Sequence, residues 1–409
     1  MASAAFSCVN VTGGDYVTED LTVSSNTVLY IGEDSRLLVG LNKTKSALVH
    51  VWNADNVTIT GGGQLYGNAE FMISYYSAID DRFQPWNGYR PHLLLVENCS
   101  VFVFRGPMAD PNSQNVVIDN IHLRNSSNWN MRLRSSRGIL VDHCTVYGSH
   151  QYPNNDGIDP ESSIDVTIRN SAIDVADDGV CPKATAGLGP LQNLYVHNTT
   201  IRSKSHAIKF GSNTDEDMFD IVFDDIEIWD SNAGLSIQQR SQGDIHNVTW
   251  SNIRVETRYV APRWWGNGEW ATISAEPREV NATIGRLYDL HFVNISALSE
   301  NGGLFSGVAH GLQNLTLTNV DVTIRAKSNY SMGVGPPCMN EFGGQTLPCM
   351  GTWDHRPSDQ EDHCSYYCRE PGQADGVYLQ NVQGARLSNV SVTYQAPALP
   401  WYGQCFAQD

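Results

Sequence analysis

The chain has 409 residues, 17% of them charged, and a formal net charge of −18 at pH 7. A chain of this length can bury one or two large cores. Asp and Glu outnumber Lys and Arg by 44 to 26, which argues against a nucleic-acid partner, because neutralising phosphates requires excess cations. No apolar run reaches the roughly 18 residues of a membrane span, so we expect no membrane partner.

The first residues predict the start of a repeat protein. Residues 1–50 alternate apolar and polar side chains, as in DYVTEDLTV and NTVLYIG, and are expected to form the first coils and an N-terminal cap. The opening MASAAFSCVNVT lacks a long apolar segment, so we expect that any signal peptide has been removed or replaced.

Short strand-like segments then recur at a nearly constant spacing. If Val117, Ile139, Val166, Leu194, Ile221 and Val248 are equivalent positions, the steps between them are 22, 27, 28, 27 and 27 residues. Such a period, without amphipathic helices between the strands, is typical of a solenoid. Asn, Asp, Ser and Gly occupy the intervening turns, where they tolerate unusual backbone angles.

The pattern predicts an all-β, right-handed parallel β-helix of about ten coils, formed by a single domain over residues 1–409. Val, Ile and Leu would fill its interior, since strand residues alternate inward and outward. Residues 331–375 interrupt the repeat and are expected to form a surface insertion. Four cysteines crowd into residues 338–368, which favours disulfides within this insertion, with Cys405 or Cys8 as further partners.

Twelve Asn-x-Ser/Thr sequons favour a secreted glycoprotein. The alternative is that repeated Asn-Val-Thr turns generate sequons that carry no glycan.

Three acids and a histidine recur in register with the repeat. Asp177 and Asp178 follow Asp156 by 21 and 22 residues, and His206 follows Asp178 by 28. One coil apart, these side chains are expected on the same face of the solenoid. Clustered carboxylates raise at least one pKa, which places a protonated acid beside ionised ones. Glycosidic bond cleavage needs this division, although a lone turn Asp more often caps its own backbone.

Several segments resemble glycoside hydrolase family 28, the polygalacturonases. Residues 154–159 (NNDGID) resemble the family's N-T-D-G-I-D segment, residues 177–180 (DDGV) its D-D segment, and residues 205–207 (SHA) its G-H-G segment. Residues 61–67 (GGGQLYG) resemble the early G-x-G-x-I-D-G turn. Each match is weak alone, but together they follow the family's order and spacing.

The resemblance implies a role for each acid. Asp177 would be the general acid, and Asp156 with Asp178 would hold and deprotonate the attacking water, giving inversion. His206 would help to keep the general acid protonated, and Asn154 would contact the sugar. No metal or organic cofactor is implied.

The sequence departs from the family at its R-I-K motif, whose two cations hold a galacturonate carboxylate. Ser236 and Gln238 stand at those positions and cannot make the same charge-assisted contacts. Lys209 or Arg240 could rebuild the carboxylate site, with Lys209 near the missing lysine. Otherwise the sugar at the cleavage point would be neutral, such as rhamnose or galactose.

Residues 263–270 (RWWGNGEW) lie between coils and are expected to form a loop rather than core. Trp264 and Trp265 could stack on sugar rings, and Arg263 and Glu269 could add polar contacts. Packing of the tryptophans against the solenoid flank is the alternative.

The sequence as a whole predicts a secreted, monomeric glycoside hydrolase whose partner is a pectin-type polysaccharide or oligosaccharide. A polysaccharide lyase would instead need calcium-binding acids and an Arg or Lys base. A non-catalytic carbohydrate-binding β-helix is the third alternative.

Overall fold

The computed structural model describes residues 7–41, 46–78, 81–86, 90–99, 115–260, 264–275, 283–307, 311–328, 374–397 and 402–408. Arg263 and the four cysteines between residues 338 and 368 lie outside these residues, so the predicted disulfides stay a prediction. Within the described residues, the cysteines are free thiols: Cys8, Cys99, Cys144, Cys181 and Cys405.

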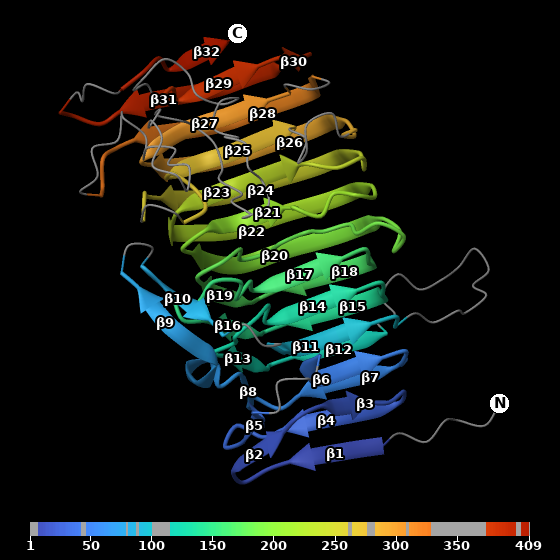
Figure 1. Ribbon diagram of the computed structural model, residues 1–409. Helices are drawn as coiled ribbons and strands as arrows, with labels where there is room; N and C mark the ends of the chain where they lie inside the picture. The colour runs from blue at the N-terminus through green and yellow to red at the C-terminus, as the bar shows by residue number, and fades with distance from the viewer. Residues whose placement is uncertain are drawn as a thin grey trace, which may run out of the picture.

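The described chain winds into a stack of coils whose strands are almost all parallel, with the N-terminus at one end and the C-terminus at the other (Figure 1). The predicted right-handed parallel β-helix is confirmed. In the described residues the largest sheet has nineteen strands. They are β1 (Ser7–Val11), β2 (Asp15–Thr18), β4 (Thr27–Ile31), β5 (Arg36–Val39), β7 (Val57–Thr60), β8 (Gln64–Tyr66), β12 (Val116–Asp119), β13 (His122–Arg124), β15 (Arg137–Asp142), β16 (Thr145–Tyr147), β18 (Ile164–Arg169), β19 (Ala172–Val175), β20 (Leu191–Ser203), β22 (Met218–Ser231), β24 (Ile245–Thr257), β26 (Leu287–Ser299), β28 (Leu312–Ile324), β30 (Val382–Gln383) and β31 (Arg386–Tyr394).

A second face of the solenoid consists of two parallel sheets in line. The first contains β3 (Leu21–Val23), β6 (Ala47–Trp52), β11 (His92–Glu97), β14 (Met131–Arg134) and β17 (Ile158–Glu161). The second contains β21 (His206–Phe210), β23 (Ala233–Gln239), β25 (Glu269–Ala275), β27 (Asn301–Ser306), β29 (Val377–Gln380) and β32 (Phe406–Gln408). Between them, Val180 bridges Ile158 and Ile208. The coil that carries Asp177 and Asp178 therefore has only isolated bridges on this face.

An antiparallel hairpin flanks the coils (Figure 1). A 3-10 helix (η1, Ala69–Met72) leads into its strands β9 (Ile73–Ser77) and β10 (Arg82–Pro85). The N–H of Phe83 donates to the carbonyl of Gln151 at 2.6 Å, and Lys204 forms an ion pair with Asp81 beside the hairpin turn. These contacts fix the hairpin against the solenoid.

The strand register confirms most of the predicted repeat. Ile139, Val166, Leu194, Ile221 and Val248 are paired in succession, as their spacing predicts. The first position was misplaced by one residue, because Ile139 pairs with Val116 rather than Val117. Val116 is buried and its neighbour is not, so the inward side chain marks the equivalent position.

Asparagines at the bends of the long strands form ladders between coils. Asn193 and Asn198 in β20 have φ of 55° and 46°, in the left-handed region that Asn tolerates. The side-chain amide of Asn198 donates to Asn170 at 2.6 Å, and that of Asn170 donates to Asp142 at 2.7 Å. Sequon asparagines share this arrangement: Asn56, Asn198, Asn247, Asn294, Asn314 and Asn389. Their presence therefore has a structural reason that is independent of glycosylation.

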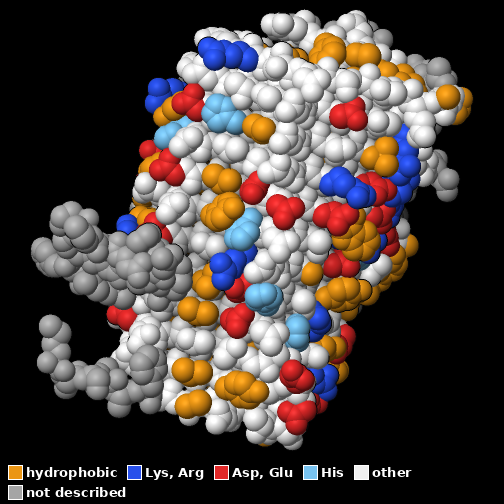
Figure 2. Space-filling model, turned by 180° about the vertical axis from the view of Figure 1, so that it is seen from behind, with side chains coloured by type: hydrophobic (Ala, Val, Ile, Leu, Met, Phe, Trp, Pro, Cys, Tyr) orange, Lys and Arg blue, Asp and Glu red, His pale blue; other side chains and the backbone are white. Residues whose placement is uncertain are grey.

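Inward side chains of the coils form one continuous apolar core, running from Val23 to Leu379. On the side turned away in Figure 1, acidic, basic and apolar side chains are interspersed (Figure 2). No helix in the described part of the chain has the length and apolar character needed to cross a membrane.

Candidate active site

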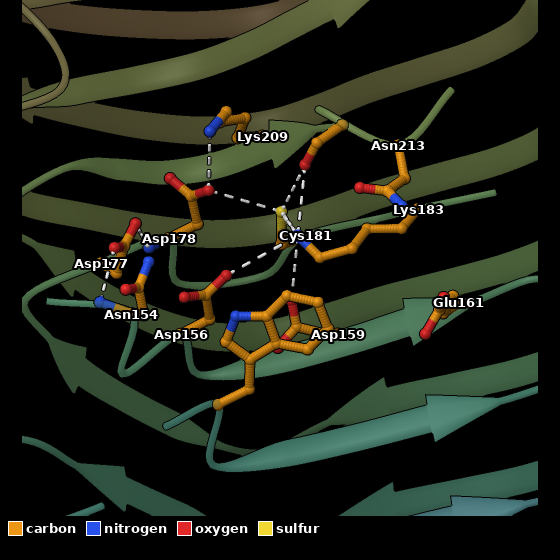
Figure 3. A network of polar contacts seen from close by, with 12 residues as sticks. Asn154, Asp156, Asp159, Glu161, Asp177, Asp178, Cys181, Lys183, Lys209 and Asn213 are labelled. Atoms are coloured by element: carbon orange, nitrogen blue, oxygen red, sulfur yellow. Dashed lines mark hydrogen bonds and ion pairs between the residues drawn. The ribbon is translucent and has the colours of Figure 1, made fainter. Parts of the chain in front are cut away.

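Three aspartates from successive coils meet at the edge of the second face (Figure 3). Asp156 precedes β17 by two residues, and Asp177 and Asp178 follow β19. The N–H of Gly157 donates to the carbonyl of Asp178 at 2.8 Å, which places one coil directly on the next. Each aspartate offers a carboxylate oxygen, and these oxygens lie within 4.8 Å of one another.

Glycines beside the acids permit this close stacking. A Cβ atom on Gly157 would lie 2.3 Å from the carbonyl oxygen of Gly179, and one on Gly179 would lie 2.6 Å from that of Ala207. Any larger residue would push the coils apart, and the acids with them.

Asp177 is 5% exposed and accepts two backbone hydrogen bonds. Its Oδ2 accepts from the N–H of Asn154 at 2.8 Å, and its Oδ1 accepts from the N–H of Asp178 at 3.0 Å. Burial, and then the charges of Asp156 and Asp178, raise the pKa of Asp177 well above its usual range. Asp177 is therefore suited to hold a proton at the pH where an ordinary aspartate is ionised.

The pKa of Asp178 is shifted in the opposite direction to that of Asp177. Burial would raise its pKa, but Lys209 and then His206 lower it far below the usual value. The Lys209 Nζ lies 3.0 Å from Oδ2 of Asp178, and Nδ1 of His206 lies 3.3 Å from Oδ1. The surroundings of Asp178 therefore favour its carboxylate form, whereas those of the neighbouring Asp177 favour its protonated form.

Asp156 is the third acid, and its environment is mixed. Burial and then Asp159 raise its pKa well above the usual value, while Lys183, with Nζ 3.7 Å from Oδ2 of Asp156, lowers it. The Oδ1 atom of Asp156 accepts no hydrogen bond from the residues that the structure describes. Asp156 lines the cleft, but this oxygen atom itself is buried.

The acids open into a cleft of about 400 Å³. Carboxylates, two lysines and aromatic side chains line it, so it can offer a sugar both hydrogen bonds and flat apolar surface. Its lining residues are Arg82, Gln84, Pro85, Trp129, Pro153, Asn154, Asp156, Asp177, Asp178, Lys183, Lys209, Gly211, Ser212, Asn213 and Trp265.

The residues at the expected carboxylate-binding positions lie apart from this cleft lining. Ser236 and Gln238 are buried in β23, at 0% and 2% exposure. Arg240 is buried just after β23, and its N–H donates to Oγ1 of Thr214 at 3.0 Å. Lys209 does line the cleft, but it pairs in register with Ser236 and so stands beside the missing arginine rather than the missing lysine.

The tryptophan-rich segment divides between the cleft and the solenoid. Trp265 lines the cleft, with the Arg82 guanidinium 5.9 Å from its ring centroid. Trp264 is 2% exposed, packs against Ala176 and faces the Lys204 ammonium, as in the alternative of flank packing. Arg263 lies outside the described residues.

The prediction that this whole segment is a loop was wrong for its last two residues. Glu269 and Trp270 begin β25 and are fully buried, and the Trp270 ring packs against Phe292 and Phe305. The glycine-rich residues before them hid the start of the strand. Glu269 lies outside the cleft lining, and its Oε2 accepts the N–H of Asn267 at 2.6 Å.

Several residues of the site were missed from the sequence. Lys183 and Cys181 alternate outward after Val180, and this short pattern could have shown that they share a face with Asp159 (Figure 3). Trp129 comes from the preceding coil, and Arg82 comes from the β9–β10 hairpin, which has no counterpart in the repeat.

The fold and the site define a parallel β-helix protein with a carboxylate-lined cleft. Residues 106–262, which carry all three aspartates and His206, match the model of the glycosyl hydrolases family 28. The resemblance predicted from the motifs is thereby confirmed.

Among curated proteins, the chain is 25% identical over 309 residues to a probable exopolygalacturonase B of Aspergillus flavus, covering 69% of this chain. The match spans 65% of the Aspergillus protein, slightly less than two thirds of its length.

Two solved structures share the fold. An exopolygalacturonase of Thermotoga maritima superposes with a TM-score of 0.60 at 17% identity, covering 78% of this chain and 79% of that one. A surface adhesin of Streptococcus pneumoniae, PfbA, superposes with a TM-score of 0.54 at 12% identity, covering 95% of this chain and 84% of that one. Since the same fold occurs in proteins with such different names, the function must be argued from the site.

Proposed function

We propose that this protein is a glycoside hydrolase that cleaves a pectin-type polysaccharide, as its polygalacturonase relatives are named for doing. The observation that carries the proposal is the meeting of Asp156, Asp177 and Asp178 in one cleft, with their carboxylate oxygens within 4.8 Å of one another. Their surroundings raise the pKa of Asp177 and lower that of Asp178. A protonated carboxylic acid beside a carboxylate supplies both the proton donor and the base that glycosidic cleavage needs.

In this proposal Asp177 protonates the departing glycosidic oxygen, while Asp178 and Asp156 hold a water and remove its proton. Lys209 and His206 keep Asp178 ionised, because both contact its carboxylate. His206 thus acts on the base, whereas the family resemblance implies that it acts on the general acid. Asn154 orients Asp177 through its backbone N–H and lines the cleft beside it.

Inversion at the anomeric carbon is part of the proposal. The closest carboxylate oxygens lie within 4.8 Å, which is shorter than the roughly 6.5–9.5 Å between the carboxyl groups of most inverting glycosidases. However, two acceptors that share one water at about 2.8 Å each are separated by about 4.6 Å, so this spacing suits a water held by Asp156 and Asp178. Proton NMR of the first product anomer tests this point, and retention would contradict it.

The proposed activity is tested by incubating the protein with polygalacturonate, rhamnogalacturonan and neutral galactan. Hydrolysis produces new reducing ends without the ultraviolet absorbance of unsaturated sugars. Unsaturated products would show a lyase, and binding without any product would show a non-catalytic module.

A hydrolase acting on a neutral sugar is the second candidate, favoured by one specific observation. Ser236 and Gln238 replace the family's cationic pair, and Lys209 is already paired with Asp178 at 3.0 Å. A cation that stabilises an internal carboxylate is less available to a substrate carboxylate. In that case galactan or rhamnogalacturonan would be cleaved faster than polygalacturonate.

Lys209→Ala separates the two candidates. Since Lys209 holds the pKa of Asp178 low, its loss raises that pKa, and activity is then lost at a higher pH as the solution is acidified. We expect this shift, with a fall in kcat, on every cleaved substrate. A rise in KM confined to uronate substrates would instead show that Lys209 contacts the substrate carboxylate. Lys327→Gln, which removes a lysine paired with Asp230 and Glu256, is the control.

The proposal includes secretion and a monomeric state, in keeping with an extracellular polymeric substrate. The sequons lend secretion little support, because many of their amides form the asparagine ladders described above. Recovery of the protein from the medium rather than from the cells tests secretion, and native mass analysis of the purified protein tests the subunit number and whether glycans are attached.

A further inference from the structure

Lys183 and Asp159 form a buried ion pair beside Asp156, and neither of them has a part in the hydrolytic steps described above (Figure 3). The Lys183 Nζ lies 3.2 Å from Oδ1 of Asp159 and 3.7 Å from Oδ2 of Asp156. The three side chains are at most 5% exposed. Two carboxylates on the same coil therefore share one ammonium group that water hardly reaches.

Lys183 is held in place from several sides. Its backbone forms a bridge with Glu161, and its Nζ donates to the carbonyl of Gly211 at 3.2 Å and to Sγ of Cys181 at 2.8 Å. The same Nζ lies 4.7 Å from the centroid of the Trp129 ring. These contacts hold the ammonium group in place beside the two carboxylates, so its charge acts mainly on Asp156 and Asp159.

The charged groups around Asp156 oppose one another. Asp159 and Asp178 disfavour a negative charge on Asp156, and so does burial, whereas Lys183 and Lys209 favour it. Asp177 is the remaining acid of the site, and burial keeps the Cys181 thiol neutral by raising its pKa. Lys209 is committed to Asp178, which leaves Lys183 as the nearest cation to Asp156 in the described residues.

We propose that Lys183 and Asp159 are positioning residues that act on Asp156 in opposite directions. Together they set the charge of Asp156, and hence whether it can help to remove a proton from water. The inference rests on the proposed hydrolytic function. Lys183 favours the ionised form of Asp156. Asp159 disfavours it, because it competes for the Lys183 ammonium group and adds a second negative charge nearby. Neither residue takes a proton from the substrate.

The proposal predicts shifts of opposite sign from two buried substitutions. Lys183→Gln removes the cation, so Asp156 ionises at a higher pH and the acidic limb of the kcat/KM profile moves up. Asp159→Asn removes the competing carboxylate at almost constant size, so this limb moves down. Charges at such distances shift a pKa by about 1 to 3 units, and we expect limb displacements in that range. Lys183→Arg should restore most of the wild-type profile.

Controls separate this role from a structural one. Circular dichroism shows which variants fold. Lys327→Gln removes a lysine that has two carboxylate partners and lies outside the cleft lining, so it should not shift the profile. If Lys183→Gln does not fold, the sign of the Asp159→Asn shift still decides. An unchanged limb, or a limb that moves up in Asp159→Asn, overturns the proposal.

Failure of the proposed function can be distinguished from failure of this inference, because the wild-type protein would then hydrolyse none of the polysaccharides. Infrared titration of the carboxyl groups, with Asp156→Asn as the reference, then reports the Asp156 proton directly. Shifts of the Asp156 titration in opposite directions in the two variants support the inference. A titration that does not shift in these directions overturns it.

Discussion

Asp177→Asn is expected to lower kcat by about 10²- to 10⁴-fold, the usual contribution of a positioned general acid. An amide of the same shape cannot donate a proton to a leaving oxygen. The protein should remain folded, because Asn keeps one acceptor oxygen and loses only one of the two backbone hydrogen bonds made by Asp177. The measurement is the rate of reducing-end release under saturating substrate.

Asp174→Asn is the matched control. Asp174 lies three residues earlier in β19, pairs with His150 and Arg202, and is outside the cleft lining. Its loss should leave kcat within a few-fold of the wild type. If Asp177→Asn kept more than a tenth of the wild-type rate, Asp177 could not be the general acid.

Trp250→Ala is expected to lower the free energy of unfolding by about 3–5 kcal/mol, as is typical when a large buried aromatic is truncated. Trp250 is fully buried and stacks between Phe223 of one neighbouring coil and Phe292 of the other, with centroid distances of 6.3 and 4.5 Å. Its removal leaves a cavity between coils that parallel strands cannot close. Urea unfolding followed by circular dichroism measures the loss.

Two companion variants sharpen this result. Trp250→Phe keeps a ring in the stack and removes a buried indole N–H that has no acceptor in the described residues, so it should cost much less. Trp229→Ala removes a half-exposed ring over the Arg202 guanidinium and should cost about 1 kcal/mol or less. Equal losses in Trp250→Ala and Trp229→Ala would contradict the importance of the inner stack.

Several features of the fold and the site could be read from the sequence because a β-helix converts sequence spacing into contact. Residues one period apart lie on adjacent coils, so the steps that connect Val166, Leu194, Ile221 and Val248 are also strand pairings. The same rule places Asp156 beside Asp177 and Asp178 from their spacing alone. The family motifs then added a chemical role to each acid.

Other features could not be read in this way, because they depend on segments outside the repeat. The β9–β10 hairpin brings Arg82 into the cleft through contacts with Gln151 and Lys204, which no period relates to it. The residues before β25 vary the length of one coil, and this hid the strand that buries Trp270.

The sequence by itself determined the solenoid, the register of its coils and the meeting of three aspartates, because each of these follows from a local period and inward–outward alternation. Only the tertiary structure decided which charged partners surround those aspartates. Lys209 pairs with Asp178, and Lys183 is shared between Asp156 and Asp159. The energy of a buried charge depends on the few ångströms to its nearest partners, and that distance is fixed by how neighbouring coils orient their side chains.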